Sequence, residues 1–291
     1  MYKFAVLCVA AAACGSSSQA PLGGDSDTSG GDSYYHGGDY AAWLQADLDF
    51  DGDADGHEDE AAAVFEGTYA QLWITSTIDE VQVVGTVNNS TLALQRVEIE
   101  LGEEGLLLRS ETCSLEIQSS TTMVRTLFPD AFIQALPISE RPAQIMPQGN
   151  GWYFYAPVFF ELRGVELEDP INDALPTDPE DPRIFDQDGD GKPGMTIVIQ
   201  GILNGEIYII QRAWSTLAGN EVNPPDFNTL VVWGDEQVIL GYSNPLLSNQ
   251  PSSQQNPDPA TQQAHWRAIQ PSMNCAEIIA QRSTLFPGHW D

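Results

Sequence analysis

The chain between residues 65 and 128 alternates hydrophobic and polar positions, which is the pattern of β-strands that bury one face. The alternation is clearest at residues 96–101, where Val97 and Ile99 stand between charged side chains. Polar or glycine-containing breaks divide the segment at roughly ten-residue spacing, as hairpin turns do. The pattern predicts strands at residues 69–75, 81–87, 92–101, 106–110, 113–118 and 121–128.

More strands are predicted after a short helix at residues 129–136; they cover residues 152–155, 158–163, 195–200, 205–214, 227–233 and 237–242. Residues 244–263, rich in Pro, Ser, Gln and Asn, are expected to form a loop or linker. Near the C-terminus we expect a helix at residues 260–269 and a second one that Asn274 and Glu277 begin as a capping box. The expected fold is mainly β, an antiparallel barrel or sandwich of about eleven strands with a short mid-chain helix and C-terminal helices.

The N-terminus has the form of an export signal, because Lys3 precedes ten uncharged residues, a run too short to span a bilayer. The small residues directly before Cys14 resemble the lipobox of bacterial lipoproteins. That resemblance implies that residues 1–13 are removed, that Cys14 is acylated and that the protein is anchored to a membrane of the cell envelope. Gly15 after the cysteine resembles an outer-membrane address. The alternative is an ordinary signal peptide with a fortuitous cysteine.

The rest of the chain divides by composition. Residues 14–46 are rich in Gly, Ser and Asp and are expected to be a flexible tether. Residues 47–63 form an acidic segment, residues 64–243 the β domain with an acidic insertion at 166–190, and residues 244–291 the linker and helices packed on that domain.

The protein is strongly acidic, with 42 Asp and Glu residues against 11 Lys and Arg residues and a formal net charge of −31. Such a surface repels nucleic acid and anionic lipid, so neither is expected as a partner except through the lipid anchor. The chain is also 42% hydrophobic, which is enough to bury a full core. We expect a monomer, with a glycan or another envelope protein as possible partners.

The most specific motif is the acidic loop at residues 186–194, where Asp186, Asp188 and Asp190 are followed by Gly191. Carboxylates at alternate positions of a tight loop converge on one point and suit Ca²⁺, with the Lys192 carbonyl as a further ligand. The loop resembles those of EF-hands, dockerins and thrombospondin type 3 repeats. It departs from the EF-hand because the twelfth position is isoleucine, so further ligands would come from Glu166, Glu168, Asp169 or Asp181. The alternative is a solvated acidic turn.

The same spacing recurs nearer the N-terminus. Its candidate ligands are Asp51, Asp53, Asp55, the His57 carbonyl and Asp59, and the glutamate of an EF-hand is again absent. The alternative is that this segment is an acidic extension of the tether.

Cys113 and Cys275 are the cysteines outside the signal and the lipobox, 162 positions apart. Export to an oxidising compartment predicts a disulfide between them, and two buried free thiols are the alternative.

The sequence contains no nucleophile elbow, P-loop or dinucleotide fingerprint, so we expect no catalytic activity. The acidity, the lipobox and the Asp-Gly-rich turn together resemble the acidic predicted lipoproteins of myxobacteria and their relatives, a resemblance that implies no particular activity. The expected function is that of a lipid-anchored envelope protein with a structural calcium loop and a binding or structural role. The alternatives are a carbohydrate-binding module, supported by the aromatic residues at 152–160, and a β-rich glycoside hydrolase that uses paired glutamates.

Overall fold

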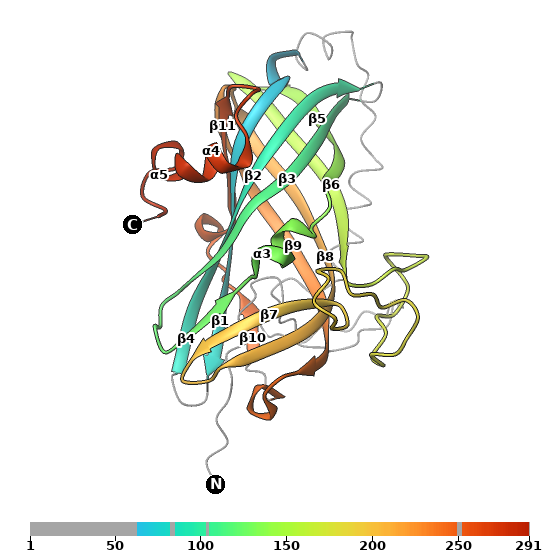
Figure 1. The fold of residues 1–291 in the computed structure, drawn as a ribbon. Helices are drawn as coiled ribbons and strands as arrows, with labels where there is room; N and C mark the ends of the chain where they lie inside the picture. The colour runs from blue at the N-terminus through green and yellow to red at the C-terminus, as the bar shows by residue number, and fades with distance from the viewer. Residues whose placement is uncertain (1–62, 82–84, 103–104, 249–251, 291) are drawn as a thin grey trace, which may run out of the picture.

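The computed structural model describes residues 63–81, 85–102, 105–248 and 252–290. Its strands are all antiparallel and belong to a single sheet (Figure 1). They are β1 (Gly67–Val81), β2 (Gly85–Gly102), β3 (Gly105–Ser119), β4 (Val124–Leu127), β5 (Ser139–Gln148), β6 (Gly151–Arg163), β7 (Met195–Gly201), β8 (Gly205–Val222), β9 (Asp226–Tyr242), β10 (Ser252–Gln255) and β11 (Gln263–Ile269). The predicted mainly β class is confirmed.

The strand pairings lead back to their starting point. The order β8-β6-β5-β3-β2-β1-β11-β9 ends on a strand that also pairs with β8. The sheet is therefore ring-like, although it is not a barrel. Strand alternation places every second side chain on the inner face of this ring, which explains why the interior is built from alternate residues of each strand.

The ring is split along one side. Strand β3 pairs with β5 only through Leu106–Ser110. Strand β8 pairs with β7 along its N-terminal part and with β6 along the rest of its length. The short helix α3 (Asp130–Gln134) lies over this split and contacts both β3 and β7. The helix buries Phe132, which packs in an apolar cluster with residues of β7 such as Met195 and Ile197.

Two apolar clusters fill the two ends of the ring. The first includes Phe65, Phe154 and Trp266, and the second includes Phe132, Met195 and Ile207. Both clusters consist of side chains removed from water, which is the main source of stability in such a fold.

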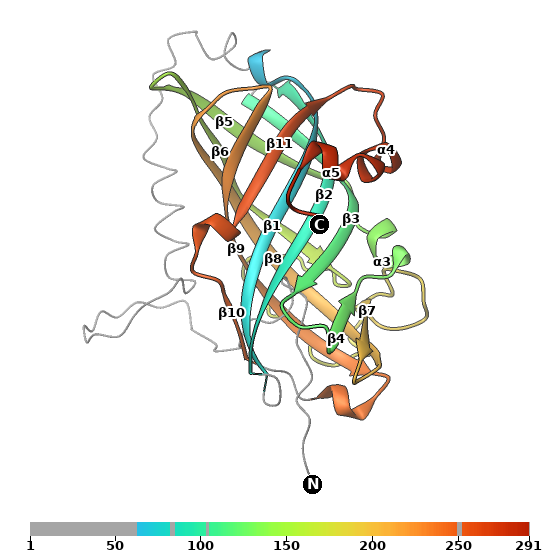
Figure 2. The same cartoon turned by 90° about the vertical axis from the view of Figure 1, so that its left-hand side faces the viewer.

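The outer face of the ring is covered in two places. Helices α4 (Cys275–Ala280) and α5 (Arg282–Leu285) lie outside the sheet, where Ile278 and Phe286 pack on Leu72 and Leu94 (Figure 2). On another side, the loop between β6 and β7 buries Leu175 against the sheet.

The predicted disulfide is present between Cys113 and Cys275, with 5.0 Å between the Cα atoms. Cys113 is the extra residue of a β-bulge, because Thr112 and Ser114 pair with consecutive residues of β2. The bulge places the cysteine on the outer face, next to the start of α4. The predicted capping box of α4 is also confirmed, because the Asn274 and Glu277 side chains bond each other's backbone N–H groups.

Several predicted boundaries are wrong. The expected breaks at residues 79–80, 88–89 and 111–112 lie inside continuous strands, because each residue there pairs across the ladder or forms a bulge. The expected helix at 260–269 is strand β11, which pairs with both β1 and β9. Strand β5 was missed because it contains two prolines, and β10 lies within the expected linker.

Candidate functional site

A cavity of about 290 Å³ lies inside the ring, between the two apolar clusters. Several residues belong both to its wall and to a cluster, such as Leu217 and Trp266 at one end and Ile197 and Ile209 at the other. Between these ends the wall combines aromatic rings with polar side chains. These include Trp73, Phe159, Phe160, Trp233, Gln71, Thr91, Gln95, Arg141, Arg163 and Gln211. A mostly apolar cavity with a few inward polar groups is the usual form of a small-molecule site.

Arg141 is the most deeply buried charge in the wall, with 5% of its surface exposed. Its guanidinium donates to the carbonyls of Ala156 at 3.2 Å and Pro157 at 2.9 Å, and to the carbonyl and hydroxyl of Ser215 at 3.3 Å. The ladder between β6 and β8 is interrupted next to Ala156, which frees these carbonyls for the arginine. Burial lowers the pKa of Arg141 to about 10, so the group remains a cation at neutral pH.

A second arginine joins a polar chain that extends from the cavity wall. Arg163 forms an ion pair with Glu161 at 2.8 Å and donates to the side-chain oxygen of Gln211. The amide of Gln211 in turn donates to Asp235 at 2.9 Å. Burial raises the pKa of Asp235 to about 6, although Gln211 and Arg163 act in the opposite direction.

Three buried polar atoms in the wall have no hydrogen-bond partner within the described part of the chain. They are the Thr91 hydroxyl oxygen and the Nε atoms of Arg141 and Arg163. Buried polar groups normally find partners, because an unmade hydrogen bond costs about 1–3 kcal/mol. All three belong to residues of the cavity wall.

The cavity reaches the surface near the split in the ring. Strand β5 pairs with β6 only through Gln144–Gln148, so the two strands diverge on the side of Arg141. The segment that follows α3 lies there and contributes Leu136 and Ile138 to the wall. Ile138 is 56% exposed, which makes it both an apolar surface residue and a border of the cavity.

The acidic loop brings together the three carboxylates that the sequence predicts. One oxygen each of Asp186, Asp188 and Asp190 lie within 4.8 Å of one another. Gly191 has the positive φ of 82° that the sharp turn requires, and the chain enters strand β7 directly afterwards, as predicted.

The loop is organised by its own hydrogen bonds. Asp186 accepts bonds from the backbone N–H groups of Gly189, Asp190 and Gly191 at 2.8–3.1 Å. Asp188 accepts from the Thr196 N–H at 2.8 Å, and its other oxygen is buried without a partner. Burial is the largest cause that raises the pKa of Asp188, and the neighbouring carboxylates Asp190 and Asp186 raise it further. A cation at this point would favour the charged form, so the donor set suits Ca²⁺.

Further predicted ligands are not brought to this cluster. Asp169 accepts bonds from Ile171 and Asn172 in its own turn, and Asp181 pairs with Arg183. Among the described residues, the group of carboxylates contains neither of these nor Glu166 or Glu168. The Lys192 N–H donates to Asp190 at 2.8 Å, and its ammonium lies 5.5 Å from the centre of the Tyr208 ring.

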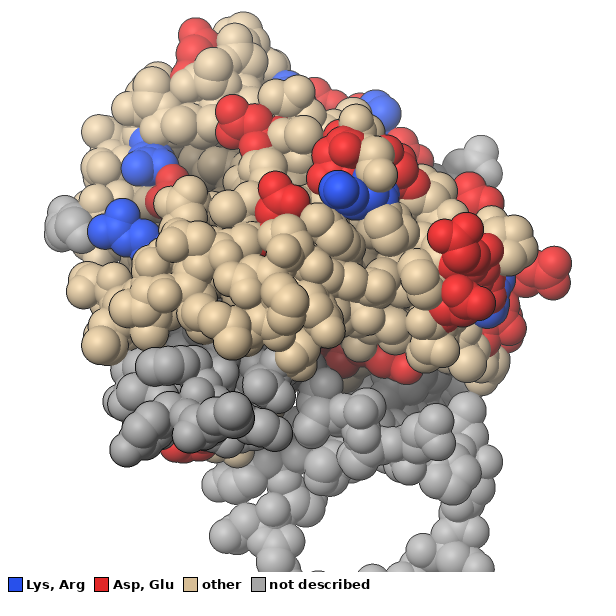
Figure 3. Space-filling view, turned by 60° about the horizontal axis from the view of Figure 1, so that its bottom comes forward, with Lys and Arg blue, Asp and Glu red and all other residues tan. Residues whose placement is uncertain are grey.

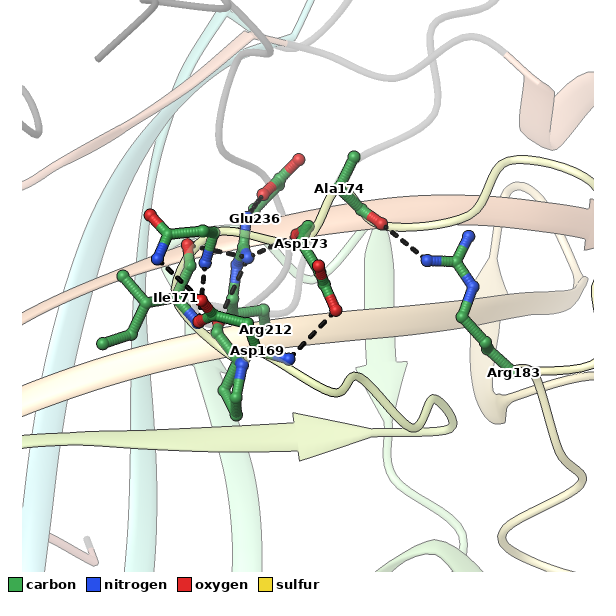
Figure 4. Close-up of polar contacts among 9 residues, drawn as sticks. Asp169, Ile171, Asp173, Ala174, Arg183, Arg212 and Glu236 are labelled. Atoms are coloured by element: carbon green, nitrogen blue, oxygen red, sulfur yellow. Dashed lines mark hydrogen bonds and ion pairs between the residues drawn. The ribbon is translucent and has the colours of Figure 1, made fainter.

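An arginine of the sheet holds the loop between β6 and β7 in place. Arg212 of β8 donates to the carbonyls of Pro170, Ile171 and Asp173 at 2.7–3.2 Å and forms an ion pair with Glu236 (Figure 4). Carboxylates gather in clusters with few basic side chains on the face shown in Figure 3. The loop therefore gives the surface a strongly negative region that is nevertheless held at defined positions.

The other predicted site residues lie outside the described residues. These are Cys14 and the second acidic motif, with Asp51, Asp53, Asp55, His57 and Asp59. In the described part of the chain, no helix has the length and hydrophobicity needed to cross a membrane.

The residues that line the cavity were not predicted as a site. Gln71, Gln95 and Gln211 alternate with apolar residues, so in the sequence they resemble the solvated face of a strand. Among the aromatic residues at 152–160, Phe154 is fully buried, whereas Phe159 and Phe160 line the cavity.

Comparison with protein-family models, with curated proteins and with solved structures gave no match. The function must therefore be argued from the site itself.

Proposed function

We propose that this protein is a cell-envelope binding protein that holds a small molecule inside its ring-like sheet. The observation that carries the proposal is the cavity of about 290 Å³, with aromatic walls and partnerless polar atoms. Cavities of this kind and size are typical of ligand sites in proteins. In this proposal the lipid anchor at Cys14 keeps the protein at the membrane, and a calcium ion stabilises the loop at Asp186, Asp188 and Asp190.

The binding role is favoured over hydrolysis by the state of the carboxylates in the wall. Glu161 is paired with Arg163, and Glu140 is paired with Arg109 at 2.8 Å. A glycosidase needs one carboxyl group that donates a proton and another that attacks or activates water. Both glutamates of the wall are held in ion pairs with arginines, so neither is free to take one of these roles.

The proposal is tested by titrating the purified full-length chain with 2-naphthoate and with its uncharged analogue 2-naphthamide, using isothermal titration calorimetry. An apolar cavity of about 150 Å³ holds benzene, so about 290 Å³ suits a two-ring compound. We expect saturable one-to-one binding of at least one of the two compounds.

The location of binding is tested by filling the cavity. Ala93 is a buried residue of the wall, so Ala93→Phe should abolish binding. Ala276→Phe, the same substitution at an exposed position of α4, is the matched control and should bind normally. If neither compound binds, or if Ala93→Phe binds as well as the unmodified chain, the proposal is wrong.

A further inference from the structure

We infer that the ligand of the cavity is an organic carboxylic acid with an apolar, ring-containing body, and that its carboxylate binds Arg141. The inference deepens the proposed function and rests on it. It follows from the charges, the hydrogen-bond donors and the apolar surface of the cavity wall.

Of the two arginines in the wall, Arg141 is the one without a directly paired carboxylate in the described part of the chain. Glu140 is paired with Arg109, and Glu161 with Arg163, whereas Arg141 has no carboxylate within 4.0 Å among the described residues. Glu161 acts on Arg141 electrostatically, but its ion pair is with Arg163. Buried charges in proteins are normally paired, because an isolated one is costly to remove from water. A monoanionic ligand would supply the missing charge.

The hydrogen-bond donors of the wall also favour an anionic ligand group. The Nε–H groups of Arg141 and Arg163 have no acceptor, and these groups can only donate. A carboxylate offers about four lone-pair sites and no donor, so it suits these groups better than an amine, which would place donors against donors.

The remaining wall fits an apolar body. The Phe159 ring lies beside the Arg141 guanidinium, 5.7 Å from its carbon to the ring centre. Trp73, Trp233 and Leu108 add apolar surface around the same space. A neutral sugar would leave the arginine unpaired, and a small inorganic anion would leave this apolar surface in contact with water. A carboxylate on a ring system uses both parts of the wall.

The net charge of the protein gives the inference a distinctive salt dependence. A chain of formal charge −31 repels an approaching anion at long range, even though the cavity attracts it at short range. Salt screens the long-range repulsion, because the Debye length falls from about 30 Å at 0.01 M to about 10 Å at 0.1 M. Affinity for the anion should therefore increase over this range, whereas affinity for a neutral analogue should not.

The first test compares 2-naphthoate with 2-naphthamide on the unmodified full-length chain by isothermal titration calorimetry. A hydrogen bond to a charged group contributes about 1.5–3 kcal/mol, so 2-naphthoate should bind about tenfold to a hundredfold more tightly. Equal affinities would overturn the inference and leave the proposed function standing. Binding of neither compound would instead contradict the proposed function.

The second test removes the cation. Arg141→Gln should lose the preference for 2-naphthoate while retaining 2-naphthamide binding, and Arg141→Lys should keep part of the preference. Arg125→Gln, which removes an exposed arginine of β4, is the control and should keep the full preference. A folded Arg141→Gln variant with the full preference would overturn the inference. Should that variant not fold, Arg141→Lys takes its place, and a folded Arg141→Lys variant with the full preference for 2-naphthoate would overturn the inference.

Discussion

The three aspartates of the acidic loop differ in what they already bind. Asp186 accepts three backbone N–H groups and shapes the turn, whereas Asp188 keeps one buried oxygen without a partner. Removing Asp186 would therefore disrupt the loop itself. Removing Asp188 and Asp190 would remove two candidate ligands and the hydrogen bonds that they accept from Thr196 and Lys192, but would leave the turn around Asp186 in place, so that pair is the better test of a cation.

We predict that chelation by EDTA lowers the melting temperature of the purified protein. A ligand at a hundred times its Kd stabilises by about 2.7 kcal/mol, which corresponds to about 5–10 °C for a domain of this size. The double substitution Asp188→Ala and Asp190→Ala should abolish this effect. The pair Glu166→Ala and Glu168→Ala, from the same loop but outside the cluster, should preserve it. A melting curve that EDTA leaves unchanged would rule out the calcium site.

Asp79 gives a prediction for pH. It is a fully buried residue of β1 and accepts bonds from Asn89 of β2 at 2.5 Å and from Ser253 of β10. Burial raises its pKa to about 6, so the folded state binds the proton more tightly than the unfolded chain does. Its contribution to stability is therefore fully present below about pH 4 and is lost as the pH rises through about 6.

Asp79→Asn should remove this dependence, because the amide cannot ionise. Relative to the unmodified chain, the variant should gain about 2–3 kcal/mol in unfolding free energy between about pH 4 and pH 7, measured by urea denaturation. Glu80→Gln, at the exposed neighbour, is the control. A difference between Asp79→Asn and the unmodified chain that does not vary with pH would contradict the assignment.

At the scale of elements, the C-terminal helices depend on their attachment. Helix α4 has six residues, too few to be stable alone, and it is held by the disulfide and by Ile278 against the sheet. Replacing Cys113 and Cys275 by serine should lower the unfolding free energy by about 4–5 kcal/mol, because the bond closes a loop of 162 residues. Urea denaturation with and without a reductant measures this loss. An unmodified protein as stable after reduction as before would refute it.

The strands show what could be predicted from sequence and what could not. Residues 96–101 were placed correctly because Val97 and Ile99 face the apolar end of the ring. Polar residues such as Asn89 and Asp79 are typical of turns, but here they are buried and bonded to each other across two strands. The local pattern of residues 260–269 predicts a helix, because it contains no information about the long-range pairing with β1 that makes residues 263–269 a strand.

The candidate sites follow the same division. The acidic loop could be predicted because its three carboxylates lie within five residues of one another. The cavity could not, because its wall is built from residues of several strands, such as Arg141 of β5 and Arg163 of β6, and exists only when the ring has formed.

At the scale of the whole molecule, the prediction concerns the anchor at Cys14. If the chain is a lipoprotein, Cys14 and the three small residues before it are the signal for acylation. Two or more acyl chains give lasting attachment to a bilayer. Cys14→Ser should therefore move the protein from the membrane fraction to the soluble fraction of the cell envelope. Fractionation followed by immunoblotting measures this, with Cys8→Ser in the signal as the matched control. A Cys14→Ser protein that stays with the membrane would contradict lipid anchoring.

The pairing of β1 with β11 has a consequence for how the molecule is made. A chain synthesised from its N-terminus exposes residues 67–81 long before residues 263–269, so one edge of β1 has no partner during synthesis. Until the last segment arrives, that edge is open to pairing with other chains. Folding therefore requires either fast delivery of the C-terminus or a chaperone that shields the edge, and truncation before β11 should yield aggregates rather than a smaller folded protein.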